Sequence, residues 1–111
     1  MNEKVIWDCL LPLVGNVYGT AAIMGNLMAE SSLKPQCATG KNKTANYTKD
    51  ADNGAVDFVN DGVAYGLVQW CFCTRKHGLM DYAKATGRSV GHLQMQLEYL
   101  VKEMSENYKT A

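Results

Sequence analysis

The sequence predicts a mainly α, single-domain protein (residues 1–111), and three observations support this. Apolar residues recur at helical spacing in four segments, at residues 3–14, 18–30, 74–85 and in a last segment after Ser89. A polar stretch without a sustained period separates the second segment from the third, and we expect a long loop or a small β excursion at residues 36–64. A length of 111 residues with 47% hydrophobic residues suits one hydrophobic core.

Two helices are predicted before the polar stretch. Pro12 lacks an amide donor, so we expect it to end or kink the helix at residues 3–14. Residues 18–30 are apolar almost all round, which is typical of a buried helix at the centre of a bundle. Gly25 costs that helix about 1 kcal/mol of propensity. We therefore expect a neighbouring backbone to approach Gly25 closely.

Two helices are also predicted after the polar stretch. Thr74 can cap a helix that runs to about Ala85 and is closed by Gly87. Ser89 can cap the last helix, which carries a strong amphipathic stripe. The stripe comprises Leu93, Leu97, Leu100, Val101, Met104 and Tyr108. It either packs in the core or offers a partner surface, in which case the protein would be a helical interaction domain.

Composition and charge exclude several functional classes. The 11 basic residues balance the 11 acidic ones, so the zero net charge argues against nucleic acid and anionic membranes as partners. No apolar run is long enough to span a bilayer, and no secretory signal is recognisable at the start, so we expect synthesis in a cytoplasm. Cys9, Cys37, Cys71 and Cys73 are then expected to be free and mostly buried, with no metal and no cofactor.

Glu30 is the most unusual acidic residue of the sequence. It follows Ile23 by seven positions and Leu27 by three, which places it on an apolar face at the C-terminal end of the second helix. Removal from water and the negative end of a helix both favour a protonated carboxyl. General-acid cleavage of a glycosidic bond needs such a group. The alternative is a helix-end glutamate that pairs with Lys34 or Arg75.

Residues 64–70 read Ala-Tyr-Gly-Leu-Val-Gln-Trp and allow two interpretations. They form either a turn whose aromatic faces and carboxamide line a sugar site, or a buried strand whose aromatic rings lie in the core. The acidic residues upstream, from Asp50 to Asp61, follow a run of lysines. This charge pattern suits a solvated loop or a cleft wall that faces a polar ligand.

Taken together, these segments resemble a known family. Residues 18–35, with Tyr-Gly-Thr at the start and Glu-Ser-Ser-Leu-Lys-Pro at the end, resemble the opening motif of the phage tail-lysozyme and endolysin-type muramidase family. Residues 64–70 resemble its Tyr-Gly-Leu-Ala-Gln-Trp motif, and residues 75–84 and 96–100 match its next two helices. The resemblance covers nearly the whole chain in the right order.

The resemblance implies an α+β lysozyme-like fold of the goose-lysozyme and lytic-transglycosylase kind. The implied reaction is cleavage of the β-1,4 bond between N-acetylmuramic acid and N-acetylglucosamine in peptidoglycan. Glu30 would be the catalytic acid, and the residues implied to bind substrate are Ser31, Tyr65, Gly66, Gln69 and Trp70. The motifs nominate no second acid. Asp57 and Asp61 precede the cleft turn, and one of them could orient a water molecule.

The resemblance favours a hydrolytic muramidase of phage-type bacterial lysis. A lytic transglycosylase that gives 1,6-anhydro products and a non-catalytic glycan-binding module remain alternatives. The family's domain usually continues beyond the helix at residues 96–100, so we expect a domain shortened at its C-terminus, which could complete its core by self-association. The expected partner is the glycan strand of bacterial peptidoglycan, and the expected route leads from the host cytoplasm to the cell wall.

Overall fold

The computed structural model describes residues 2–109, without the side chains of Asn2 and residues 107–109. The elements in chain order are α1 (Asn2–Val14), α2 (Val17–Ser31), β1 (Ala38–Thr39), α3 (Tyr47–Asn53), β2 (Ala64–Tyr65), α4 (Cys73–Ala85) and α5 (Leu93–Lys109). Helices dominate and the two strands are short, which confirms the predicted mainly α class with a small β excursion.

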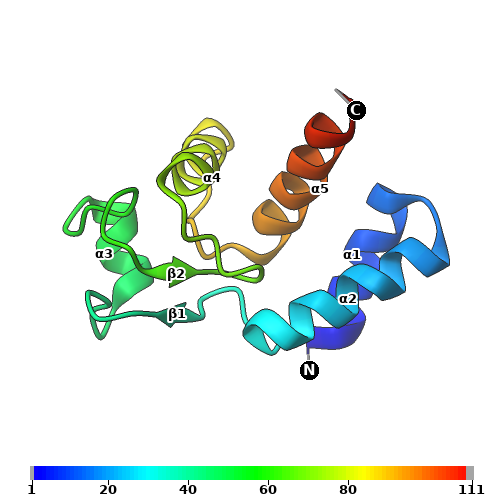
Figure 1. The fold of residues 1–111 in the computed structure, drawn as a ribbon, viewed down its shortest axis with the longest axis horizontal. Coiled ribbons are helices and arrows are strands. Elements are labelled where there is room, and N and C mark those ends of the chain that lie inside the picture. Colours follow the sequence, from blue (N-terminus) through cyan, green and yellow to red (C-terminus); the bar gives the residue numbers. More distant parts are fainter. Residues whose placement is uncertain (1, 110–111) are drawn as a thin grey trace.

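The elements form two groups (Figure 1). One contains the four long helices, and the other contains α3 and the two strands. On one side α1 packs against both α2 and α5, and α5 also packs against α4. On the other side lie α3 and the two strands, which pair antiparallel with Ala38 opposite Tyr65 and Thr39 opposite Ala64. Within the described residues no helix is both long and apolar enough to cross a membrane.

The helix α1 contributes Ile6 and Leu10 to the core, where both side chains are fully buried. It runs through Pro12 and ends at Val14, the predicted last residue, so of the two expected effects of Pro12 the ending of the helix does not occur. Pro12 lies on the exposed side of α1. Water can therefore satisfy the carbonyl group of Asp8, which the proline ring leaves without its helical donor.

The helix α2 is not the buried centre of the fold, so this expectation is also wrong. It lies at the side of the molecule and buries one face, while Tyr18 is 88% exposed on another (Figure 1). Several of its apolar residues are alanines, whose small side chains cost little in water. A Cβ at Gly25 would meet no described atom within 4 Å, so no neighbouring backbone approaches it.

The excursion at residues 36–64 contains α3 in addition to the two strands. Periodicity over long windows misses a helix of 7 residues. Its signals are local: Tyr47 and Ala51 lie one turn apart and are both buried, and Gly54 closes the helix with a φ of 75°. The segment that looked like a polar loop in the sequence is thus packed onto the domain through Tyr47.

The caps of the last two helices differ from those predicted. Phe72 is the N-cap residue of α4, and Thr74 lies inside that helix. Gly87 adopts a φ of 66° just beyond α4, as predicted. The Nδ1 atom of His92 accepts a hydrogen bond from the amide of Met95, so His92 caps α5 in place of Ser89.

The apolar stripe of α5 packs into the core. Leu97 and Leu100 are buried, and Leu93, Val101 and Met104 pack partly buried against them. The side chain of Tyr108 lies outside the described residues. Because α1 and α4 pack against α5, the described part of the stripe belongs mainly to the core.

The four cysteines are free, as expected, but they are not mostly buried. Cys9 and Cys37 are half-buried, whereas Cys71 and Cys73 are exposed at the start of α4. Both exposed thiols flank the N-cap residue of α4, where the chain has just left the buried turn at residues 65–70.

Candidate functional site

The end of α2 presents a free carboxylate. Glu30 is the one acidic residue of α2; it is exposed, and its side chain has no hydrogen-bond or ion-pair partner among the described residues. The expected apolar environment is therefore absent, because α2 has its main packing partner, α1, on one side only. The alternative pairing with Arg75 is also wrong, since Arg75 pairs with Glu103. Glu30 is available to a ligand.

The backbone turns sharply directly after Glu30. Ser31 is buried, and its hydroxyl donates to the carbonyl group of Leu27 at 3.1 Å. Ser32 and Leu33 then adopt φ values of 54° and 62°, in the left-handed region that costs ordinary residues about 1–2 kcal/mol each. Strain of this kind persists where the surrounding structure imposes it, and it concentrates at functional sites. The strained pair thus marks the end of α2 as a site candidate.

Residues 65–70 form a tight hairpin turn. The amide of Tyr65 donates to the Trp70 carbonyl at 2.9 Å, and the Trp70 amide donates back at 2.8 Å. Gly66 has a φ of 86°, and a Cβ there would lie 2.9 Å from both Gln96 Oε1 and the Trp70 ring, so only glycine fits. Gln69 is a third non-glycine residue with a left-handed φ, at 53°.

Hydrogen bonds attach this turn to the segment that leaves α2. The carbonyl oxygen of Cys37 accepts from the amide of Gly66 at 2.8 Å and from the side chain of Gln69 at 3.0 Å. The two segments singled out in the sequence are therefore joined, and Figure 1 shows the turn beyond β2 near the end of α2.

Gln96 adds a second attachment from α5. Its buried Oε1 accepts from the amide of Leu67 at 2.9 Å, while its Nε2 donates to the carbonyls of Pro35 and Val90, each at 2.7 Å. One side chain thus links the turn, the segment after α2 and the loop before α5. Gln96 lies in a predicted helix, but its spacing predicts no role for it.

Most of the predicted substrate-binding side chains are buried or hydrogen-bonded to other groups of the protein. Tyr65 and Trp70 are fully buried: Tyr65 pairs its hydroxyl with Thr48, and Trp70 Nε1 donates to Glu103 at 3.2 Å. The Gln69 amide bonds to Cys37, Gly66 and Thr39. The rings of Tyr65 and Trp70 therefore lie in the core, as the second interpretation of residues 64–70 has it, although residues 65–70 form a turn, as the first has it. The implied roles of Gly66, Gln69 and Ser31 in substrate binding stay predictions. Gly66 and Ser31 are buried as well.

The two candidates for a second acid lie in different environments. Asp57 is exposed and accepts hydrogen bonds from Asn60. Asp61 pairs with the fully buried Lys76 at 2.8 Å and also accepts from Tyr47 and the Val63 amide. Burial by itself would raise the pKa of Asp61, but the bonds from Lys76, Tyr47 and Val63 outweigh it and lower that pKa. Asp61 is therefore an ionised structural partner.

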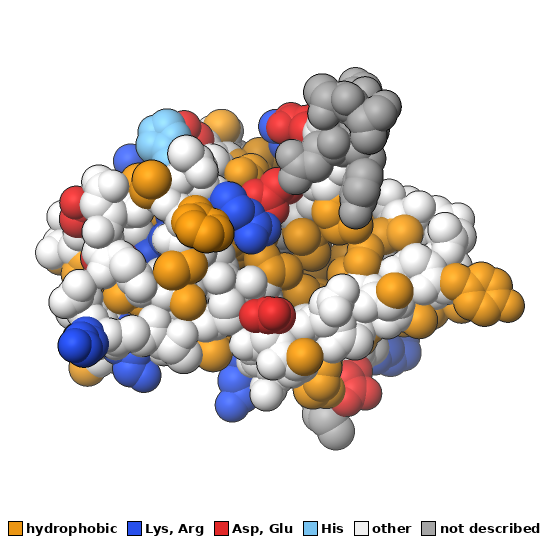
Figure 2. Space-filling model, viewed as in Figure 1, with side chains coloured by type: hydrophobic (Ala, Val, Ile, Leu, Met, Phe, Trp, Pro, Cys, Tyr) orange, Lys and Arg blue, Asp and Glu red, His pale blue; other side chains and the backbone are white. Residues whose placement is uncertain are grey.

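An apolar hollow separates α2 from α5 on the face shown in Figure 2. Charged side chains gather between α4 and α5 on the same face. Arg75 on α4 holds Glu103 on α5 through contacts of 2.7 and 3.0 Å. In residues 2–109 no group of three or more His, Cys, Asp and Glu side chains is arranged to hold a metal ion.

Comparison with known proteins gives one result. A family model described as phage tail lysozyme matches residues 1–111, the whole chain. Searches of curated proteins and of solved structures give no significant match.

Proposed function

The chain belongs to the phage tail lysozyme family, and we propose that it cleaves the β-1,4 bond between N-acetylmuramic acid and N-acetylglucosamine. Family membership supports the general statement that the chain is a lysozyme-like glycosidase domain that acts on peptidoglycan. The specific bond and the residue that breaks it are our proposal, and so is the bacterial cell wall as the place of action.

One observation supports Glu30 as the general acid. It is an unpartnered carboxylate at the end of α2, followed by two left-handed residues and joined through Cys37 to the turn at residues 65–70. A glycan strand bound over the end of α2 would displace water from this carboxyl, which is the condition under which a carboxyl retains a proton. Glu30 would then protonate the leaving oxygen as positive charge develops on the sugar ring.

A water molecule would complete the reaction at the sugar ring. The alternative is attack by the sugar's own C6 hydroxyl, which makes the enzyme a lytic transglycosylase. Asp61 would not activate this water, because its oxygens accept hydrogen bonds from Lys76, Tyr47 and Val63. Mass analysis of the fragments separates the two reactions: a reducing muramic acid end indicates hydrolysis, and a 1,6-anhydro end indicates transglycosylation.

The substitution Glu30→Gln tests the assignment. It keeps the shape of the side chain and removes its proton, so we expect peptidoglycan turnover to fall by about 10²–10⁴-fold. Stability should change by less than about 0.5 kcal/mol, because the side chain is exposed and unpartnered. Turnover is measured as the release of soluble muropeptides from purified peptidoglycan, and stability by urea unfolding.

The matched control is Glu3→Gln, which removes another exposed carboxyl, in the first turn of α1. It should leave turnover unchanged. Undiminished lysis by the Glu30→Gln protein would refute the role of Glu30. Binding to peptidoglycan without turnover by the unaltered chain would instead favour the non-catalytic glycan-binding module.

A further inference from the structure

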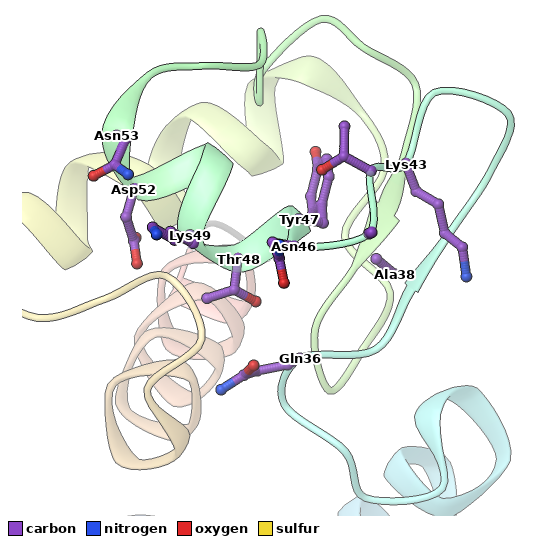
Figure 3. Close-up of a pocket in the computed structure, with 11 residues that line it drawn as sticks. Gln36, Ala38, Lys43, Asn46, Tyr47, Thr48, Lys49, Asp52 and Asn53 are labelled. Carbon is purple, nitrogen blue, oxygen red and sulfur yellow. The ribbon is translucent and has the colours of Figure 1, made fainter.

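A second concave surface lies beside α3, and Glu30 is not among the residues that line it. It is a hollow of about 600 Å³ bounded by α3, β1 and the segment that leaves α2 (Figure 3). The side chains of Asn46 and Thr48, at the start of α3, and of Gln36, in the segment after α2, point into the same space, whereas Lys43 extends away from it. The volume is in the range of small-molecule sites.

The polar groups in the hollow are available to a ligand. The side-chain amides of Gln36 and Asn46 have no hydrogen-bond partner among the described residues. Each amide offers two donors and one acceptor, so the pair can bind a ligand that carries both kinds of group. The Thr48 hydroxyl is paired with the Tyr65 hydroxyl and keeps acceptor capacity on the side of the hollow.

Close packing holds the walls of the hollow in place. A Cβ at Gly91 would lie 2.8 Å from Thr48 Cγ2 and 2.9 Å from Gln36 Cγ, so the backbone of Gly91 touches both. Asp52 on α3 accepts hydrogen bonds from the Ser89 hydroxyl and the Val90 amide, which fastens the loop before α5 against α3. A ligand would therefore meet a preformed surface and pay little ordering entropy.

The charges around the hollow favour a neutral ligand. Lys49 and Lys43 lie at the lining, but the Lys43 side chain points outward in Figure 3. Asp52 contributes a negative charge to the same lining. An anion would thus find no concentration of positive charge among the groups that face the space. Hydroxyl and acetamido groups match the two free amides instead.

We propose that this hollow binds an N-acetylated sugar ring of the peptidoglycan glycan strand, at a distance along the surface from Glu30. The inference deepens the proposed function and rests on it for the identity of the polymer. The hollow would hold the strand during catalysis without touching the reacting bond. Loss of its contacts should raise KM for polymeric peptidoglycan and leave kcat unchanged.

The binding experiment uses the full chain with the substitution Glu30→Gln and the probe tri-N-acetylchitotriose. We expect the side-chain amide NMR signals of Gln36 and Asn46 to shift on titration. The further change Asn46→Ala should weaken the binding that these signals report by roughly tenfold, the effect of one lost hydrogen bond. The change Gln36→Ala should act in the same direction. The control Gln94→Ala removes an exposed amide on α5 that does not line the hollow, and it should have no effect.

Three results would overturn the inference. The first is a titration in which the signals of Gln36 and Asn46 do not move. The second is unchanged affinity and unchanged KM in the Asn46→Ala protein. The third is displacement of the sugar by inorganic phosphate, which would identify an anion site. If the unaltered chain fails to cleave peptidoglycan while the Gln36 and Asn46 signals still shift, the proposed reaction fails and the sugar site stands.

Discussion

At the scale of the residue, Lys76 and Asp61 form a buried ion pair between α4 and the loop before β2. The ammonium group of Lys76 is fully buried and donates to Asp61 Oδ1, to the Val63 carbonyl and to the Tyr47 hydroxyl. It also lies 4.2 Å from the centre of the Phe58 ring. All three donors of the lysine are used. The pair therefore fastens α4 to α3 and to the loop before β2.

The substitution Asp61→Asn should be strongly destabilising because it leaves the buried ammonium of Lys76 without its counter-charge. We expect a loss of about 3–5 kcal/mol in the free energy of unfolding, measured with urea at neutral pH. The control Asp57→Asn removes an exposed carboxylate whose side-chain hydrogen bonds, among the described residues, come from Asn60, and it should change stability by less than about 0.5 kcal/mol. Equal effects of the two substitutions would contradict this account.

The same pair also predicts how the stability of the fold changes at low pH. Because the pKa of Asp61 is lowered in the folded chain, its contribution to stability is present above the unfolded value of about 3.9. That contribution is lost as the pH falls further, through the lowered pKa. Below about pH 4 the Asp61→Asn protein and the unaltered chain should therefore approach each other in stability.

The sequence was a poor guide to which single residues are exposed. It predicted an apolar environment for Glu30 and offered a sugar site for the ring of Trp70. In the structure Glu30 is exposed and Trp70 is fully buried. The reason is that the exposure of a helix face depends on how many neighbours the helix has, which no local pattern reports. It was a better guide to backbone geometry, since Gly87 closes α4 as predicted and α2 ends within one residue of its predicted bound.

At the scale of the element, α2 contains a glycine that lowers its stability and that can be replaced. Gly25 lies in mid-helix with open space around it, so Gly25→Ala should raise the free energy of unfolding by about 1 kcal/mol. The contrasting change Gly66→Ala should destabilise by more than that amount, because Gly66 has a positive φ and a Cβ there would clash with Gln96 and Trp70. Thermal unfolding of the two proteins distinguishes the cases. A destabilised Gly25→Ala protein would show that α2 has a close neighbour there.

Helices of ordinary length could be predicted from periodicity, but α3 and the joining of the two motif segments could not. The join depends on Gln96, whose side chain reaches Pro35 and Leu67, far away in the sequence. A single buried amide that bonds to three backbone groups leaves no periodic trace. It was the resemblance to a family, and not the spacing of residues, that brought these segments into one hypothesis.

At the scale of the whole molecule, buried tyrosines determine the pH above which the fold loses stability. Burial raises the pKa of Tyr65 to about 12 against the opposing hydrogen bond from Thr48. Burial and the neighbouring Asp61 raise the pKa of Tyr47 still further. Their stabilising effect is complete below the unfolded value of about 10 and is lost as the pH rises through the folded values.

We therefore expect the urea midpoint to be level up to about pH 10 and to fall at higher pH. Each buried tyrosine should contribute up to about 1.4 kcal/mol per pH unit to this fall. The substitution Tyr65→Phe should reduce the slope, whereas Tyr18→Phe, at a side chain that is 88% exposed, should not. Equal slopes for the two substituted proteins would contradict the assignment.

The position of α2 at the side of the molecule also has a dynamic consequence. Its main packing partner is α1, whereas α5 is held between α1 and α4. Amide protons in α2 should thus exchange with solvent through a partial opening that leaves α4 and α5 folded. The helix that carries Glu30 would then open more readily than α4 and α5, and a bound glycan strand would protect it from that opening.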